Sequence, residues 1–205
     1  MAATAWTGRV NTDEDLAGID LAAAELRNCT FTRCSLVDAR LAEAVTDGCV
    51  FDGCDLSGAR LNASTHTGSA FLNCRFRAAS LFGAQFSDCK LTGSAFEDAD
   101  LTALRIDGGD WSLVNLRHQD LAGWDLRGLR LREADLYGAD LRRADLRGAD
   151  LDHAVLDTAV LAQADLRGAD LTGVDLRQVD LAQVHLDVAQ AVALAQAYGA
   201  QVHWD

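Results

Sequence analysis

The feature that most constrains this fold is a five-residue spacing of large apolar residues. In residues 134–151 the triplet Ala-Asp-Leu recurs every five residues. Stepping by five from Leu16 to Leu186, 33 of the 35 positions hold Leu, Phe, Ile or Trp, and only Thr46 and His66 differ. A helix repeats near 3.6 residues and a half-buried strand near 2, so neither element alone explains this period. The spacing never slips, which leaves no room for an inserted loop between these limits.

Each pentapeptide divides into a short extended part and a corner. A small residue stands two places before the large one, with a polar residue between them, and the two residues that follow often end in Gly. Small-polar-large is the pattern of a three-residue strand with two side chains inside, and Gly permits the positive φ that tight turns need. Four such sides close a square coil of 20 residues, and stacked coils lie about 4.8 Å apart. We therefore expect an all-β quadrilateral β-helix over 16–186, with an N-terminal cap over 1–15 and a helix and tail over 187–205.

The six cysteines support this arrangement, because all of them occupy the small inward position. In a 20-residue coil they form two columns with two serines: Cys29, Cys49, Ser69, Cys89, and Cys34, Cys54, Cys74, Ser94. Their spacing of five does not fit the two-to-four gap of zinc-binding pairs. We interpret them as small buried hydrophobes in a reducing compartment, with no metal site.

Two places interrupt the regular pattern. Thr46 and His66 differ by 20, so one wall lacks its large residue for two coils; a polar pair in the core is expected there, with a bulged contact site as the alternative. Between 104 and 129 the small positions are also irregular. We expect Gly109 to make room for Trp111, and Gln119 and Trp124 to widen or bend the tube or to point outward.

The end of the chain changes to helical spacing. Asp187 and Gln190 match a capping box, and Gly199 is placed to end a helix. One helical face carries the predicted dimer interface: Val188, Ala191, Val192, Ala195 and Tyr198. This face either closes the open end of the tube or pairs two copies about a two-fold axis, and pairing hides both the unpaired strands and the core. We favour the homodimer through this helix.

Acidic residues dominate the charge, with 31 Asp and Glu against 18 Lys and Arg and a net charge of −13. Such a balance opposes nucleic-acid binding, which neutralises phosphates with cations, and fits either a basic partner or solubility alone. Asp fills most of the outward mid-strand positions from 135 to 180. Six of them are the candidate partner-binding residues: Asp135, Asp140, Asp145, Asp150, Asp165 and Asp170. A structural role remains open, since these carboxylates can bond a neighbouring turn and nearby arginines offset their charge.

The pattern resembles the pentapeptide-repeat family, whose repeat is A(D/N)LXX and whose fold is a right-handed quadrilateral β-helix. Three segments, HTGSAFLNC (66–74), DLRGLRLRE (125–133) and DVAQAVALAQAYG (187–199), resemble the MfpA branch of the Qnr-like fluoroquinolone-resistance proteins. This resemblance implies a DNA mimic that binds and inhibits DNA gyrase and protects it from fluoroquinolones. Projecting loops, which many Qnr proteins carry, are missing from this repeat, so a loop-dependent mechanism is not expected.

The expected dimensions suit partial mimicry of DNA. About nine coils give a rod of roughly 43 Å, and two rods end to end span roughly 85 Å, about 25 base pairs. A dimer then carries about half the charge density of duplex DNA.

Other function classes find less support in the sequence. The five histidines fall in different columns of the 20-residue coil, and no phosphate loop, GxSxG or HExxH motif occurs, so neither an enzyme nor a cofactor is expected. No stretch approaches a signal peptide or a membrane span, which predicts a cytoplasmic protein without membrane contact. The alternative function is a structural or interaction module, or a self-resistance factor for another topoisomerase poison.

Overall fold

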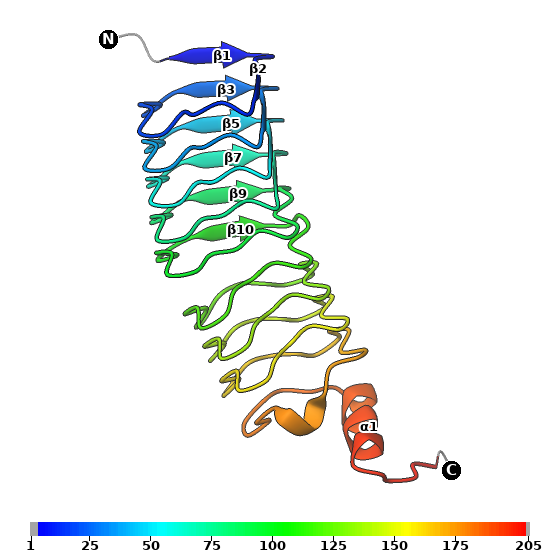
Figure 1. The fold of residues 1–205 in the computed structure, drawn as a ribbon. Coiled ribbons are helices and arrows are strands. Elements are labelled where there is room, and N and C mark those ends of the chain that lie inside the picture. The colour runs from blue at the N-terminus through cyan, green and yellow to red at the C-terminus, as the bar shows by residue number, and fades with distance from the viewer. Residues whose placement is uncertain (1–3, 204–205) are drawn as a thin grey trace. The chain divides into compact units, whose positions relative to one another are not determined.

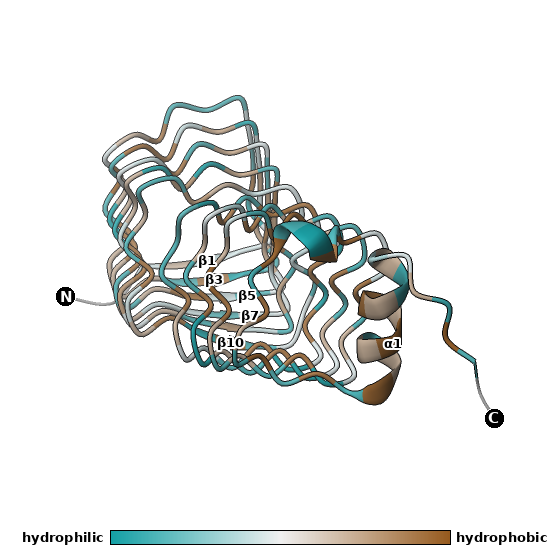
Figure 2. Cartoon of the chain, turned by 90° about the horizontal axis from the view of Figure 1, so that it is seen from below, coloured by the Kyte–Doolittle hydropathy of each residue, from teal (hydrophilic) through white to brown (hydrophobic). Residues whose placement is uncertain are grey.

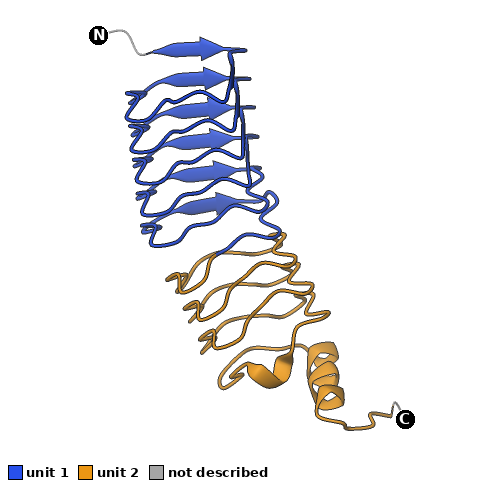
Figure 3. Ribbon diagram, viewed as in Figure 1, with its two compact units in different colours: residues 1–115 blue, residues 116–205 orange. Residues whose placement is uncertain are grey.

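The computed structural model describes residues 4–203, and the chain forms two compact units, residues 1–115 and 116–205 (Figure 3). The sequence predicts one continuous repeat, and the irregular small positions between 104 and 129 lie on both sides of this division. Each unit is described by itself below, and the predicted total length stays a prediction.

Unit 1 is a parallel β-solenoid in which paired residues of adjacent coils are 20 positions apart. The first wall stacks six strands in the order β1 (Ala5–Thr7), β3 (Glu25–Arg27), β5 (Val45–Asp47), β7 (Thr65–Thr67), β9 (Gln85–Ser87) and β10 (Arg105–Asp107) (Figure 1). The second wall stacks β2 (Val10–Thr12), β4 (Thr30–Thr32), β6 (Val50–Asp52) and β8 (Ala70–Leu72). The third and fourth walls pair through single bridges, such as Asp55 with Arg75 and Arg60 with Ser80. The predicted β-helix with a 20-residue coil is confirmed.

In the strands, the large residue lies one position earlier than predicted. In the first two walls the large residue is the middle of the strand: in β4, Phe31 is buried between Thr30 and Thr32. The expected small-polar-large strand is therefore wrong for these walls. In the other walls only the polar residue before the large one forms a bridge, and the next residues turn at once. Ala39, for example, donates its N–H to the carbonyl of Leu36 at 3.0 Å.

The corners explain why the walls are so short. From residue 18 to residue 173, the second residue after each large position takes a positive φ, as Gly58 does at 68° and even Leu113 at 60°. Left-handed backbone costs a non-glycine residue about 1 kcal/mol. Backbone hydrogen bonds to the adjacent coils offset this cost. Asn28, for example, donates its N–H to Asp47 of the next coil at 2.8 Å.

The interior repeats from coil to coil because identical positions stack. Phe31, Phe51 and Phe71 form a column with ring centroids 4.7 and 4.6 Å apart and planes nearly parallel. All six cysteines are buried and free, as expected for the small inward position. Burial raises the pKa of Cys49 and of Cys89 to about 11, which keeps these thiols protonated and unreactive at neutral pH. Figure 2 shows the hydropathy alternating along each coil.

The coil starts earlier than Leu16. Residues 1–3 of the expected cap lie outside the described residues, but β1 and β2 already pair in register with β3 and β4. Trp6 and Asn11 continue the large-residue positions, and Asn11 is fully buried. A single polar side chain at this position hides the repeat from sequence inspection.

The irregular coil has a different cause from the one expected. A Cβ on Gly109 would lie 2.0 Å from the backbone oxygen of Cys89, so glycine permits backbone contact there rather than making room for Trp111. Trp111 is fully buried. In unit 2, Gln119 is buried and Trp124 is half-buried.

Unit 2 continues the same repeat with leucine columns and alanine at the small positions. Its walls pair through single bridges such as Asp145 with Asp165 and Asp150 with Asp170. Near its end the chain makes one 3-10 turn, η1 (Leu176–Gln178), and then the helix α1 (Val188–Ala197). No helix within residues 4–203 is both long and apolar enough to cross a membrane.

The predicted capping box of α1 is confirmed. Asp187 accepts the N–H of Gln190, and the Gln190 side chain accepts the N–H of Asp187, both at 3.0 Å. The Gln190 amide also donates to the carbonyls of Leu166 and Ala169 at 2.5 and 2.9 Å. These are backbone acceptors of the coil, so one glutamine joins the helix to it.

His66 forms the expected polar pair in the core of unit 1. Its Nδ1 lies 2.8 Å from Thr46 Oγ1 and its Nε2 lies 2.9 Å from Ser64 Oγ. Since Ser64 donates to the carbonyl of Leu61, it must accept from Nε2–H, and Thr46 then donates to Nδ1. The neutral imidazole satisfies both partners, and burial lowers the pKa of His66 from 6.5 to about 3.

Replacing His66 with Leu should therefore reduce the acid sensitivity of the protein. In the unfolded chain the imidazole protonates below pH 6.5, whereas in the folded chain it stays neutral until about pH 3. Between these values each pH unit lowers the free energy of unfolding by about 1.4 kcal/mol. Urea unfolding of wild type and H66L from pH 7 to pH 4 should show the wild type losing stability more steeply in acid than H66L. Parallel curves would contradict the buried neutral imidazole.

Candidate functional site

The mid-wall aspartates of unit 2 hold the turn that follows them. In each of the six candidates, Oδ1 accepts the N–H of the residue two places on. The distance is 3.1 Å from Asp135 to the N of Tyr137 and 3.0 Å from Asp170 to that of Thr172. A short side chain with an acceptor oxygen is what this turn requires, so Asp is frequent here for a structural reason.

The six candidates do not share one face. Bridges join Asp145 to Asp165 and Asp150 to Asp170, which gives one pair on each of two walls. Asp135 and Asp140 are bridged to Val155 and Val160 on the two remaining walls. The structure therefore brings four of the six together in two pairs and places the other two separately.

Arginines neutralise most of these carboxylates. Where the sequence reads Asp-x-Arg, the guanidinium bonds both oxygens of the Asp two places before it, an arrangement we call the Asp–Arg clamp. For Asp145 and Arg147 the two distances are 2.8 and 2.6 Å. Five clamps occur in unit 2: 125/127, 140/142, 145/147, 165/167 and 175/177.

The clamps on one wall also connect neighbouring coils. Arg127 Nε lies 3.7 Å from Asp145, and Arg147 Nε lies 3.7 Å from Asp165. The bond from Arg167 holds the pKa of Asp165 down at about 2. This wall therefore presents alternating charges and not a row of acids.

The remaining candidates have different surroundings. Asp135 pairs with Arg117 at 3.0 Å, and that guanidinium also lies 4.3 Å from the ring centre of Tyr137. Asp150 lies 3.5 Å from Arg132, which also bonds Asp152. Asp170 is exposed, and among the described residues it has no cation within ion-pair distance. The Asp-x-Arg spacing was visible in the sequence, whereas the pairs between coils needed the 20-residue register.

Acidity as a whole is not confined to unit 2. Unit 1 holds 16 acidic and 9 basic residues, a net charge of −7, and unit 2 holds 15 and 9, a net of −6. The clustering seen in the sequence concerns the mid-wall position alone.

The predicted interface face of α1 is uncovered in the single chain. Val188 and Tyr198 are 71% and 68% exposed, and Ala191 is also exposed. Val192 and Ala195 are half-buried. Gln190, on the opposite side, donates to the carbonyls of Leu166 and Ala169.

No metal or cofactor site is evident among residues 4–203. The described part of the chain holds no group of three His, Cys, Asp or Glu side chains placed to bind a metal ion. The candidate residues lie on outer walls and on one helix face.

Comparison with known proteins gives the family. The pentapeptide-repeat model matches in eight copies, over 15–53, 34–65, 67–98, 79–110, 112–148 and 144–183. The chain belongs to the pentapeptide-repeat family.

Among solved structures, the pentapeptide-repeat chain is similar to QnrB1, described as a plasmid-mediated fluoroquinolone resistance protein. One trypsin-treated variant is 25% identical, with 98% of this chain and all of that chain covered and a TM-score of 0.64. A second such variant is also 25% identical, with 96% and 99% covered and a TM-score of 0.65. No curated protein matches the chain in sequence.

The stability given by a mid-wall Asp should come from the turn and not from the ion pair. Asp145→Asn keeps the acceptor oxygen and should change the free energy of unfolding by less than about 0.5 kcal/mol. Asp145→Ala removes the acceptor and should lose about 1 kcal/mol. The same pair of variants at Asp170, which lacks a clamp, serves as the control and should behave alike in urea unfolding. A large loss of unfolding free energy in D145N, without the same loss in the Asp170→Asn control, would show that the ion pair gives most of the stability.

Proposed function

We propose that this protein binds DNA gyrase, inhibits supercoiling and protects the enzyme from fluoroquinolones. The observation that carries the proposal is the likeness to QnrB1 over 98% of this chain and all of that chain at 25% identity. The resemblance of residues 66–74, 125–133 and 187–199 to the MfpA branch extends it. The net charge of −13 and the outward carboxylates on all four walls of unit 2 suit a cationic partner surface.

The clamps refine how such a mimic works. A clamped Asp adds little net field because its guanidinium neighbour cancels it at short range. Carboxylates without a bonded guanidinium, such as Asp170, then contribute more to steering than clamped ones such as Asp145 or Asp165. Charge complementarity of this kind acts mainly on the association rate and weakens with salt.

A supercoiling assay with purified gyrase tests the proposal directly. The wild type should inhibit supercoiling at micromolar concentration and reduce drug-induced cleavage. A variant with all six candidate aspartates changed to Asn keeps the turn acceptors and should inhibit about tenfold less well. The control changes four aspartates of unit 1 that hold their turns in the same way: Asp15, Asp20, Asp100 and Asp110.

Two results would count against the proposal. Absence of both inhibition and protection by the wild type would reject gyrase as the partner, and would favour an interaction module with another target. Equal loss in the two Asn variants would reject the six candidates as the binding residues while leaving the partner in place.

We further propose that α1 forms a homodimer interface through its uncovered apolar face. Changing Val188 and Tyr198 to Asp would place charges on that face without touching Gln190 or the coil. The double variant should elute as a monomer from a sizing column, where the wild type elutes as a dimer. Val10→Asp, at another exposed apolar residue in unit 1, is the control. A wild-type monomer would reject the interface.

A further inference from the structure

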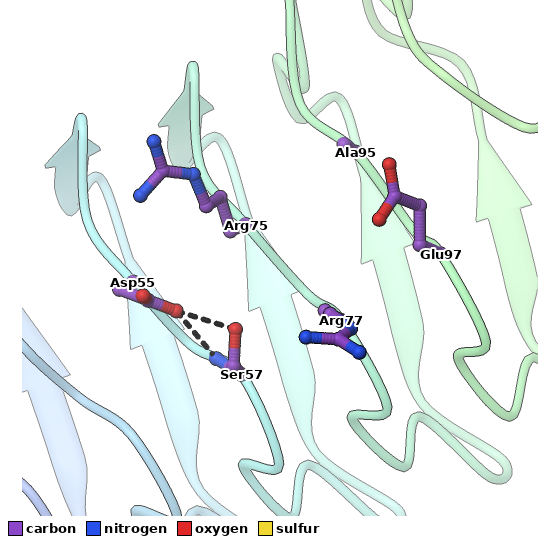
Figure 4. Close-up of a pocket in the computed structure, with 6 residues that line it drawn as sticks. All are labelled: Asp55, Ser57, Arg75, Arg77, Ala95 and Glu97. Carbon is purple, nitrogen blue, oxygen red and sulfur yellow. Dashed lines mark hydrogen bonds between the residues drawn. The ribbon is translucent and has the colours of Figure 1, made fainter.

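The third wall of unit 1 contains a hollow of about 250 Å³. It is lined by the outward residues of three successive coils: Asp55 and Ser57, Arg75 and Arg77, Ala95 and Glu97. Figure 4 shows the two arginines extending from one coil, with the other residues on the coils before and after it. The hollow lies entirely within unit 1.

A small side chain accounts for the hollow. Bridges join Asp55 to Arg75 and Arg75 to Ala95, so the three residues occupy the same mid-wall position in consecutive coils. Ala95 ends at its Cβ where its neighbours carry long or charged groups. The space above it therefore opens between the Arg75–Arg77 coil and Glu97.

The two arginines keep their charge available. In unit 2 an Asp precedes each clamped Arg by two residues, but at this point the sequence reads Arg-x-Arg and no clamp can form. Within the described residues, neither guanidinium lies within ion-pair distance of a carboxylate. Both residues are exposed. Two guanidiniums on one coil are suited to bidentate contact with a carboxylate.

The nearby acids define what the hollow can accept. Asp55 uses one oxygen to accept the N–H and the Oγ–H of Ser57, at 2.9 and 2.6 Å. Glu97 stands on the other rim. A ligand with a high negative charge would be repelled by Asp55 and Glu97. A single carboxylate that has cationic neighbours could instead pair with the two arginines, while its neighbours pair with the two acids.

We propose that this hollow receives an acidic side chain of the protein partner. The inference rests on the proposed function, because it describes how an acidic solenoid fixes its position on a largely cationic partner surface. Attraction between two extended charged surfaces changes little when one slides by a coil. A cationic hollow on an acidic wall can pair with a partner carboxylate at only one position. It therefore fixes how far along the partner surface the solenoid lies.

The sign of a charge reversal separates this proposal from general electrostatic attraction. Changing Arg75 or Arg77 to Glu makes the protein more acidic. If the negative field alone drives binding, each variant should bind gyrase as tightly as the wild type or more tightly. If the hollow receives a carboxylate, each variant should bind about tenfold more weakly despite its larger negative charge.

The experiment measures binding of the full-length protein to purified gyrase at two salt concentrations, for wild type, R75E, R77E and R105E. Arg105 is the control, because it is an exposed arginine on the first wall of unit 1 that has no ion pair among the described residues. Weaker binding of R75E and R77E with unchanged or tighter binding of R105E supports the proposal. Urea unfolding of each variant shows that the solenoid is intact.

The other outcomes are distinct. If the wild type binds gyrase and R75E and R77E bind equally tightly or more tightly, the proposed role of the hollow is rejected. The proposed function is then unaffected. Equal weakening of all three variants also overturns it, since any arginine would then serve. Absence of wild-type binding rejects the proposed function, and this inference with it.

Discussion

Parallel pairing of each residue with the one 20 positions later is the constraint on which the structure depends. Because β-strands of adjacent coils lie one above another, each inward residue meets its own counterpart, and the core becomes a set of columns. Phe31, Phe51 and Phe71 stack with centroids less than 5 Å apart for this reason. The left-handed corners, which are unfavourable one at a time, are held because the ladder bonds on both sides leave no other conformation.

The same constraint gives the mid-wall aspartate two roles. Its Oδ1 satisfies the backbone N–H of the following turn, and its charge faces outward. In residues such as Asp145 a guanidinium also bonds the carboxylate, so an acid that helps the fold need not add to the external field. The net charge of the chain therefore overstates the acidity that a partner meets on some walls. Asp170 shows the opposite case, because it bonds Thr172 and carries no clamping guanidinium.

Much of this could be predicted from the sequence, because the period of five is so regular. The coil length, the buried cysteine columns, the capping box at Asp187 and the His66–Thr46 pair all follow from residue phase. The start of the coil was hidden because Asn11 is a polar residue in an apolar position. The division at residue 115 falls within the irregular small positions between 104 and 129, although the period of five continues through them. Gly109 was misread since its close neighbour, the backbone of Cys89, is 20 residues away. The hollow beside Arg75 depends on three coils at once, and only the register shows that Ala95 lies next to that arginine.

The unbroken register has a consequence for how such a chain can change during evolution. Adding or deleting 20 residues would preserve every column and every wall, and would alter only the number of coils. Adding five would also keep the interior, since leucine again meets leucine, yet everything beyond that point would rotate by a quarter turn. Outer residues would then face a new direction with almost no disturbance to the core. In this architecture, surface pattern and interior can therefore diverge independently through small duplications.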